Sequence, residues 1–312
     1  MHILIPDDYQ NAVRTLDCFA KLAGHTVTIY NDTVKDLNAL AARLEPADAL
    51  VLIRERTPIT ADLLARLPRL QLIAQTGRGT THIDLAACAQ RGITVTNGTG
   101  SSHATAELTW ALILAATRFI PQEVALFRAG HWQSHFGRGL HGRTLGVWGY
   151  GGIGSLVARY GEAFGMRVMV WGREGSLTRA RADGFSLAPD KATFLAESDV
   201  LSLHVKLNAE TRGLGTAADF AQMKPDALFV NTSRAELIEP GALVEALRAG
   251  RPGFAAVDVY EQEPILGADH PLLAMDNVIC TPHLGYVEKD SYEGYFGQAF
   301  DQVVAFAAER WT

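Results

Sequence analysis

The chain has 312 residues, of which 48% are hydrophobic and 20% are charged, and its formal net charge is −6. This balance is typical of a folded globular protein of about two domains, and it excludes a mainly disordered chain. The acidic excess argues against general binding of nucleic acid or of an anionic membrane, and no apolar run approaches the roughly 20 residues of a spanning helix.

Short apolar runs alternate with longer Ala- and Leu-rich helical runs throughout the chain. Several short runs are apolar at nearly every position, as in strands of a parallel sheet that is covered on both faces. The alternation predicts an α/β fold with doubly wound parallel sheets. The predicted strands cover residues 2–5, 26–30, 49–53, 70–75, 94–96, 144–148, 167–171, 200–204, 227–231, 255–259 and 278–280.

A long apolar helical run, over about residues 102–119, divides these strands into two groups. Five strands precede it and six follow it, which predicts a smaller N-terminal unit and a larger second unit. The stretch 130–143 is rich in Gly, His and Arg and is expected to form a loop. A last helical run over 292–308 could pack on either unit.

A glycine-rich motif follows the strand at 144–148. Gly149, Gly151 and Gly154 form G-x-G-x-x-G, followed by a helical run over 155–164 and a second strand. In this setting the first glycine permits a tight turn, the second lets the backbone approach a pyrophosphate, and the third allows close helix packing. The helix N-terminus offers free N–H groups to the phosphates. A plain glycine turn is the alternative, but the full βαβ context favours dinucleotide binding.

The acidic residue that would grip a ribose 2′-hydroxyl is absent at the end of the second strand. Gly172 takes its place, which removes a repulsion toward a 2′-phosphate. Arg173 can pair with that phosphate or stack on the adenine, and Ser176 can add a hydrogen bond. Glu174 could instead neutralise Arg173 or reach the ribose. We expect both NAD and NADP to work as cofactors, with NADP slightly favoured.

Three later strands lead into polar residues suited to hydride-transfer chemistry, namely Arg234, Glu263 and His283. Because the carboxyl ends of parallel strands share one edge of a sheet, these side chains should face one crevice. A histidine can exchange the hydroxyl proton, a carboxylate can orient its ring, and an arginine can clamp a substrate carboxylate at two points. Each residue alone is commonly a surface charge or a loop histidine, whereas the combination after a dinucleotide motif favours catalysis.

The chain resembles the D-isomer-specific 2-hydroxyacid dehydrogenases over nearly its whole length. The resemblance implies an NAD(P)-dependent oxidoreductase that transfers a hydride between a nicotinamide and a D-2-hydroxy acid or 2-keto acid. The stretches that carry it are Gly77-Arg78-Gly79, Ala106-Glu107, 149–154, Met223-Lys224-Pro225, 231–234, 258–264 and 281–285.

The resemblance also implies roles for individual positions. Arg234, Glu263 and His283 match the family's catalytic Arg, Glu and His in order and spacing. Two departures, Ala235 for a usual Gly and Lys206 for a usual Pro, bear on local geometry only. The positions expected at the cofactor are Gly149, Gly151, Gly152, Ile153, Gly154, Gly172, Arg173, His204, Thr232 and Asp258, the last at the nicotinamide carboxamide.

The same resemblance implies two domains and a pair of subunits. A flavodoxin-like substrate domain over 1–100 is expected to be completed by 284–312, and a Rossmann dinucleotide-binding domain to cover 101–283. The apolar helix should cross between the domains, and the region near 102–143 should form a homodimer interface, as in many paired α/β subunits. Domain closure would exclude water before hydride transfer.

Two loops of the N-terminal unit are candidates for binding the substrate. In Gly77-Arg78-Gly79 successive N–H groups can form an anion nest for a carboxylate, and Arg78 can add a charged contact. Arg54 and Arg56 could hold a second anionic group, such as a phosphate or a distal carboxylate. An ordinary glycine turn and solvent-facing arginines are the alternatives. The sequence leaves open the roles of His103, Trp132, His135 and Tyr286.

Two other functions fit the same motifs. One is a phosphonate- or formate-type dehydrogenase of the same fold; formate enzymes carry Gln where Glu263 stands, whereas phosphonate-oxidising relatives keep all three catalytic groups. The other is a non-catalytic dinucleotide-sensing protein, which the joint presence of Arg, Glu and His disfavours. Neither a metal site nor a nucleic-acid partner is expected.

The three cysteines and the N-terminal residues bear on the compartment. Cys18, Cys88 and Cys280 are far apart and odd in number, which favours free thiols over a disulfide framework. The first eight residues turn acidic where a secretion signal would need a long apolar core. We therefore expect a cytoplasmic protein without such a signal.

Overall fold

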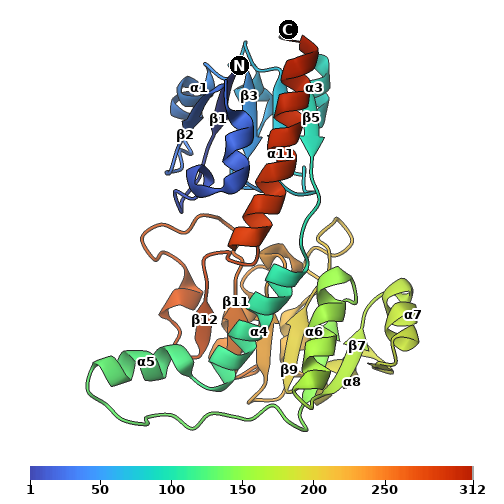
Figure 1. Ribbon diagram of the computed structural model, residues 1–312. Helices are drawn as coiled ribbons and strands as arrows, with labels where there is room; N and C mark the ends of the chain where they lie inside the picture. The colour runs from blue at the N-terminus through green and yellow to red at the C-terminus, as the bar shows by residue number, and fades with distance from the viewer. Residues whose placement is uncertain (311–312) are drawn as a thin grey trace. The chain divides into compact units, whose positions relative to one another are not determined.

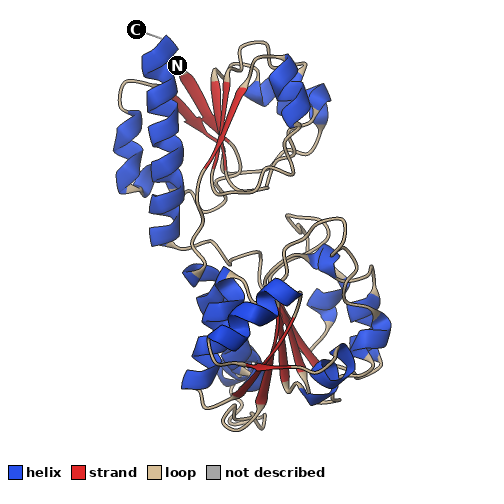
Figure 2. Ribbon diagram, turned by 90° about the vertical axis from the view of Figure 1, so that its right-hand side faces the viewer, coloured by secondary structure: helices blue, strands red, loops and turns tan. Residues whose placement is uncertain are grey.

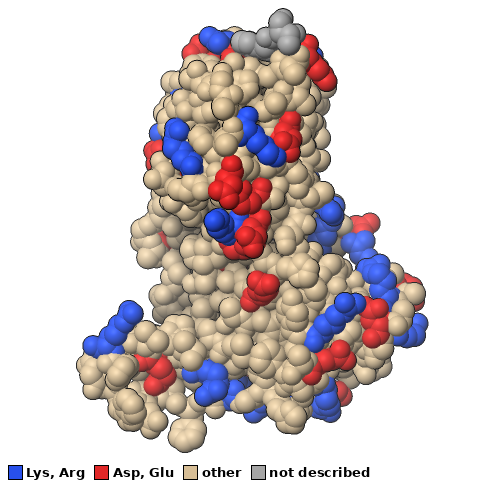
Figure 3. All heavy atoms as spheres, in the orientation of Figure 1, with Lys and Arg blue, Asp and Glu red and all other residues tan. Residues whose placement is uncertain are grey.

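In this computed structural model, which describes residues 1–310, the chain forms two compact units. One comprises Met1–Ser101 with the segment from Val287 onward, and the other is Ser102–Tyr286. Charged side chains of both signs are interspersed on the face seen in Figure 3. Within 1–310 no single helix is long and apolar enough to cross a membrane, although the bent pair His103–Thr117 and Ile120–Arg128 meets those criteria together.

The first unit is a parallel sheet with helices on both faces (Figures 1 and 2). Its strand order, β2-β1-β3-β4-β5, is that of a flavodoxin-like sheet. β3 and β4 are buried at every position, as their nearly continuous apolar sequence predicts. The strands are β1 His2–Ile5, β2 Thr26–Ile29, β3 Ala49–Leu52, β4 Leu72–Gln75 and β5 Thr94–Asn97.

The helices of this unit begin at capping residues that the sequence supplies. Asp36, Thr60 and Asp84 each accept a main-chain N–H at the start of a helix. The C-terminal helix α11 packs on the 3₁₀ helix Asp17–Leu22 and against β4, so the last helix belongs to the first unit. The α-helices are α1 Leu37–Leu44, α2 Ala61–Leu64, α3 Leu85–Gln90 and α11 Lys289–Arg310.

The second unit is a seven-stranded parallel sheet of order β12-β11-β10-β9-β6-β7-β8. The direction in which the strands are added reverses between β6 and β9, and ligands of such sheets bind at the carboxyl ends of strands beside this point. The shortest strand, β8, was not predicted, because two residues carry no readable period. The strands are β6 Thr144–Trp148, β7 Arg167–Trp171, β8 Ser186–Leu187, β9 Val200–Leu203, β10 Leu228–Asn231, β11 Phe254–Val257 and β12 Val278–Cys280.

Helix α4 is apolar nearly all round because it is covered on several sides. It packs on α6 and against β10 and β11 of the second unit. The helices of this unit are α4 His103–Thr117, α5 Ile120–Arg128, α6 Gly152–Ala163, α7 Glu174–Ala182, α8 Lys191–Glu197, α9 Ala217–Phe220 and α10 Ala242–Arg248, with short 3₁₀ turns at Ala235–Leu237 and Pro271–Ala274.

Helix α5 and the loop after it, residues 120–139, form an arm that leaves the body of the second unit (Figure 1). No residue of α5 is buried. Glu123 accepts hydrogen bonds from the main chain of Ser134 and His135, which ties the loop to the helix. The arm exposes large apolar side chains, namely Ile120, Val124, Phe127, Trp132 and Phe136.

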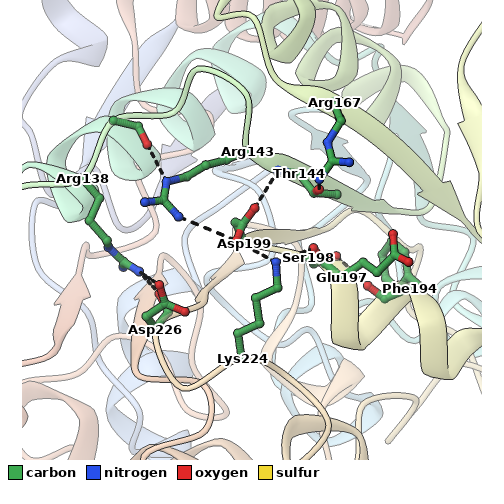
Figure 4. Close-up of polar contacts among 11 residues, drawn as sticks. Arg138, Arg143, Thr144, Arg167, Phe194, Glu197, Ser198, Asp199, Lys224 and Asp226 are labelled. Carbon is green, nitrogen blue, oxygen red and sulfur yellow. Dashed lines mark hydrogen bonds and ion pairs between the residues drawn. The ribbon is translucent and has the colours of Figure 1, made fainter.

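The arm returns to the sheet at a network of charges at the amino ends of the strands (Figure 4). Arg138 pairs with Asp226 at 3.3 Å. Asp199 accepts hydrogen bonds of 2.8 Å from the ammonium of Lys224 and from the N–H of Thr144. Burial opposes ionisation of Asp199, but these contacts hold its pKa below the usual value. The network therefore joins the start of β6 to neighbouring loops through a charged carboxylate.

Candidate active site

The polar residues singled out in the second unit follow neighbouring strands at one edge of the sheet. His204 follows β9, Thr232 and Arg234 follow β10, Asp258 follows β11, and His283 lies just beyond β12. Since β9 to β12 are adjacent and parallel, their carboxyl ends lie side by side. The sheet therefore gathers residues that are up to 79 positions apart in sequence.

Glu263 and His283 form a close pair. The Nδ1 atom of His283 lies 2.5 Å from Oε2 of Glu263, and the other carboxylate oxygen accepts the N–H of Tyr260 at 3.0 Å. Both side chains are partly exposed, at 24% for His283 and 32% for Glu263. Among residues 1–310 the ring's Nε2 has no hydrogen-bond partner. The pair therefore presents one imidazole nitrogen for proton exchange and fixes the other.

The surroundings of Glu263 favour its ionised form. Burial acts to raise the pKa of this carboxyl, but the hydrogen bond and charge of His283, the N–H of Tyr260 and the charge of Arg234 outweigh it. The resulting pKa lies below that of an ordinary glutamate. Glu263 is therefore an anion at neutral pH and can stabilise a protonated His283.

Asp258 holds the loop that carries His283. The side chain is fully buried, and its carboxylate accepts the hydroxyl of Thr281 at 2.6 Å and the N–H groups of Leu284 and Gly285 at 2.7 and 2.8 Å. These donors flank His283, whose φ of +54° lies in the left-handed region. Burial raises the pKa of Asp258, and the donors only partly offset it. This bracing of the loop was missed at the sequence level, because the resemblance implied only a cofactor contact.

Arg234 stands in an ordered turn after β10. Asn231 donates to its carbonyl oxygen at 2.9 Å, and its own Nη1 donates to the carbonyl of Ser233 at 2.7 Å. Thr232 shares a 2.8 Å hydroxyl contact with Thr109 of α4. The next residue, Ala235, opens a 3₁₀ turn and has no left-handed φ, so the alanine that replaces the family's glycine is not strained there.

The glycine-rich turn after β6 is tightly packed at two of its glycines and open at the third. A Cβ at Gly149 (φ +96°) would lie 2.6 Å from the carbonyl oxygen of His204, and one at Gly154 would collide with the carbonyl of Gly149. At Gly151, the N-cap of α6, no atom lies within 4 Å of the Cβ position. Gly152 and Ile153 follow as the first residues of α6, whose N–H groups have no intrahelical acceptor. The turn thus combines close packing on one side with open donors on the other.

His204 supplies an unsatisfied polar atom beside this turn. Its Nε2 lies 2.8 Å from the Ser202 hydroxyl, while its buried Nδ1 has no partner among the described residues. Burial lowers the pKa of the imidazole to about 3, so the ring is neutral. An orphaned atom beside a glycine cradle fits a bound polar group, and the residues present therefore suit a dinucleotide.

At the end of β7 the structure pairs Arg173 with a residue that sequence reasoning did not consider. Its Nη1 lies 3.4 Å from Oε2 of Glu210, and both side chains are largely exposed. Glu174 instead accepts the hydroxyl of Thr178 at 3.3 Å. Gly172 lies against Ser176, whose Cβ is 3.3 Å from where a Cβ of residue 172 would stand. Glu210 was missed because it lies on a loop 37 residues away.

In the first unit the glycine loop is built around Arg54. The main chain of Arg54 is fixed by the hydroxyl of Thr76 and the amide of Gln75, both at 2.9 Å. A Cβ at Gly77 (φ +86°) would collide with the Arg54 guanidinium, which also lies 5.3 Å from the ring centroid of Tyr295. The positive φ thus favours glycine at 77, and any larger residue would also displace the Arg54 guanidinium.

The other residues of these two loops differ in their surroundings. Gly79 lies against Glu55, and Arg78 is exposed. Arg56 donates to the carbonyl of Asp7 at 2.5 Å and to the Tyr292 hydroxyl at 3.3 Å. Arg56 therefore braces the first unit internally.

Of the four residues whose roles the sequence left open, Tyr286 lies beside the pair formed by Glu263 and His283. Its ring centroid is 5.3 Å from that of His283. His135 and Trp132 belong to the arm, where His135 pairs with Glu123 at 2.7 Å and Trp132 contacts Phe127. His103 is the first residue of α4.

Comparisons with known proteins agree with this arrangement. Residues 110–285 match the model of the D-isomer-specific 2-hydroxyacid dehydrogenase NAD-binding domain. Glyoxylate reductase of Aeropyrum pernix is 40% identical over 282 residues, which cover 86% of this chain and 82% of that protein. D-3-phosphoglycerate dehydrogenase of Methanocaldococcus jannaschii is 39% identical, and the match covers 79% of this chain and 47% of that longer protein.

A solved structure extends the likeness to nearly every residue. The phosphoglycerate oxidoreductase from Vibrio cholerae O395 is 55% identical, with a TM-score of 0.97 and coverage of 99% of both chains. The fold, the NAD-binding unit and this similarity agree with the resemblance seen in the sequence. The chain therefore belongs to the D-isomer-specific 2-hydroxyacid dehydrogenase family and is an oxidoreductase that acts on CH–OH groups.

Proposed function

We propose that this protein interconverts a D-2-hydroxy acid and the corresponding 2-keto acid, with His283 as general acid/base, Glu263 as its partner and Arg234 as ligand of the substrate carboxylate. The observation that carries the proposal is the 2.5 Å contact between His283 and Glu263, with Nε2 of the histidine left without a described partner. The nearby charge of Arg234 supports it.

The side chains suggest a simple division of labour. A bound nicotinamide would supply or accept the hydride. The planar fork of Arg234 suits a carboxylate and can polarise the adjacent carbonyl. In reduction, Nε2 of His283 gives a proton to the carbonyl oxygen, and in oxidation it takes the hydroxyl proton back. Glu263 holds the ring through Nδ1 and stabilises its protonated form throughout.

We assign the cofactor to the turn at 149–154. Gly149, Gly151, Gly152, Ile153 and Gly154 would hold the pyrophosphate at the start of α6. The remaining proposed contacts are Gly172, Arg173, His204, Thr232 and Asp258. The absence of an acid at 172 and the exposed Arg173 support use of NADP as well as NAD, with a slight preference for NADP.

In the first unit we propose that the loop Gly77-Arg78-Gly79 contacts the substrate through its main-chain N–H groups and the Arg78 side chain. Arg54 would bind a second anionic group, such as a distal carboxylate or a phosphate. Its fixed main chain and its place against Gly77 support a prepared cation beside this loop. Arg56 is left out of the proposal because Asp7 and Tyr292 occupy its guanidinium.

The exposed arm supports a homodimer. Single apolar side chains at a surface need no explanation, but Ile120, Val124, Phe127, Trp132 and Phe136 all lie on one short segment. We expect light scattering to give twice the chain mass of 33.8 kDa. Phe136→Glu should shift the protein toward monomer, whereas Val304→Glu on α11 should not. A single-chain mass for the wild type would contradict the proposal.

The three cysteines have no disulfide partners, which supports a reducing, cytoplasmic location.

The activity is tested by following nicotinamide absorbance during reduction of a panel of 2-keto acids. The panel includes glyoxylate and keto acids with a second carboxylate or a phosphate, each with NADH and NADPH. Turnover of a 2-keto acid that falls by about 10²–10⁴ in His283→Gln is the expected result. Cofactor binding without turnover of any acid would favour a dinucleotide sensor and overturn the proposal.

A further inference from the structure

Tyr260 contacts both loops that carry the proton-transfer pair. In sequence it follows β11 and precedes Glu263, and its main-chain N–H donates to Oε1 of Glu263 at 3.0 Å. Its hydroxyl donates to the carbonyl oxygen of Thr281 at 3.0 Å, two residues before His283. One residue therefore reaches the carboxylate of the pair and the main chain that presents the imidazole.

We propose that Tyr260 is a positioning residue that keeps Glu263 and His283 within hydrogen-bond distance of each other. Its hydroxyl does this by linking the segment after β11 to the loop after β12. This inference rests on the proposed function, because it concerns the same proton transfer. Tyr260 itself is not assigned any contact with substrate or cofactor.

The hydroxyl completes a set of anchors on the His283 loop. Asp258 accepts the Thr281 hydroxyl and the N–H groups of Leu284 and Gly285, but it does not contact the carbonyl oxygen of Thr281. The Tyr260 hydroxyl binds that oxygen. The loop therefore has an extra anchor on its approach to His283, which is held at a left-handed φ that β-carbon-bearing residues rarely adopt.

The tyrosine ring is itself fixed. Tyr260 is 8% exposed, and its ring centroid lies 5.1 Å from that of His270. His270 in turn contacts Oε2 of Glu261 at 3.1 Å and accepts the N–H of Leu272. Burial raises the pKa of the phenol, so the hydroxyl keeps its proton and remains a hydrogen-bond donor at neutral pH.

The pair is sensitive to small shifts, because a hydrogen bond weakens steeply with distance and angle. Tyr260→Phe removes only the hydroxyl, since the main-chain N–H to Glu263 and the packed ring are retained. Loss of the anchor should let the His283 loop move away from Glu263 without emptying either binding site.

The kinetic test compares Tyr260→Phe with Tyr30→Phe. Tyr30 is the matched control, since its hydroxyl also faces a main-chain carbonyl, that of Arg43 at 3.4 Å in the first unit. We expect kcat of Tyr260→Phe to fall about tenfold, the scale of one hydrogen bond, with KM for the keto acid and the cofactor within about twofold. Tyr30→Phe should keep its kcat. An unchanged kcat in Tyr260→Phe, or a loss carried by KM alone, would overturn the inference.

The pH profile separates positioning from a general loss of structure. The charged groups facing the Glu263 carboxyl are His283 and Arg234. Burial raises the pKa of Glu263, and the contact with His283 lowers it. If this contact loosens, the effect of burial is less offset and the pKa of Glu263 rises. The acidic limb of the kcat profile should therefore move to higher pH in Tyr260→Phe. A uniform loss at all pH values would indicate a structural effect instead and contradict the inference.

Proton NMR tests the same point without turnover. An imidazole N–H in a short bond to a carboxylate gives a resonance far downfield, which Glu263→Gln should abolish. This resonance should move upfield or broaden in Tyr260→Phe and stay in place in Tyr30→Phe, with both variants held below their melting temperatures. If the wild type reduces no 2-keto acid, the proposed function fails, yet this measurement still decides whether Tyr260 positions the pair: an unshifted resonance rejects it.

Discussion

In the second unit, one aspartate with little exposure lies at the amino ends of the strands and another lies at their carboxyl ends. The pKa values of these two carboxyls are shifted in opposite directions. At the amino ends, Asp199 accepts hydrogen bonds from the Lys224 ammonium and the Thr144 N–H, and its pKa is lowered although burial opposes this. At the carboxyl ends, Asp258 accepts one hydroxyl and two main-chain N–H groups, and burial raises its pKa.

The difference separates a structural network from a candidate catalytic one. At the amino ends the cations Lys224, Arg143 and Arg138 are paired with Asp199 and Asp226 (Figure 4). At the carboxyl ends the hydrogen-bond donors to the Asp258 carboxylate are one hydroxyl and two main-chain N–H groups, which are neutral, and the charge of His283 also acts on this carboxyl. The carboxylates at the amino ends are thus held by cations of the fold, whereas Asp258 at the carboxyl ends is held mainly by neutral donors.

The largest expected effect comes from removing the proton-transfer group at the carboxyl ends. His283→Ala should lower kcat by about 10²–10⁴, the usual contribution of general acid–base catalysis. Cofactor affinity, measured by fluorescence titration, should change little. His25→Ala in the first unit is the control and should retain activity. Near-normal turnover in His283→Ala would rule out the assignment.

A second variant tests whether Arg234 binds the substrate carboxylate. Arg234→Lys preserves the charge but loses the planar fork, so KM for the keto acid should rise sharply, by about tenfold or more, and kcat should fall. Arg143→Lys at the amino ends is the matched control and should leave both constants unchanged. An unaltered KM in Arg234→Lys would place that residue with the structural charges.

The cofactor end of the same edge should respond more moderately. Gly172→Asp introduces the acid that repels a 2′-phosphate and binds a ribose hydroxyl. The ratio of kcat/KM for NAD to that for NADP should rise by roughly five- to 150-fold, which corresponds to about one to three kcal/mol. If the wild type already prefers NAD by more than about a hundredfold, Arg173 does not favour NADP as proposed.

The smallest effect on activity, and a clear one on stability, is expected at the amino ends. Asp199→Asn should lower the free energy of unfolding at neutral pH by about 1–3 kcal/mol, because the carboxylate that accepts from Lys224 and Thr144 is replaced by a neutral amide with one acceptor oxygen. Thermal melts should reveal this loss, while kcat and KM stay near the wild-type values. A fall in kcat comparable to that of His283→Ala would break the comparison.

The pH dependence of that variant gives a second measurement. The pKa of Asp199 is lower in the folded than in the unfolded state. Its contribution is therefore present above the unfolded pKa and is lost as pH falls below about 4 through the folded value. Urea unfolding between pH 6 and 3 should show a shallower decline for Asp199→Asn than for the wild type. Equal slopes would mean that Asp199 is not the titrating group.

Much of this arrangement was predictable because its signals are local. The strand–glycine–helix pattern around Gly149 and the near-continuous apolar strands follow from backbone sterics and from burial on both sheet faces. The positions of Arg234, Glu263 and His283 at strand ends follow from the same alternation. The family resemblance added their roles, which remain proposals.

The contacts that decide geometry are nonlocal, and only the tertiary structure supplied them. Asp258 braces the His283 loop, Glu210 meets Arg173, and Tyr260 reaches Thr281, each across 21 to 37 positions of sequence. Residue type and spacing determined which strands form and what chemistry their ends can carry. Which side chains meet was decided by parallel strand pairing, which brings distant segments to one edge.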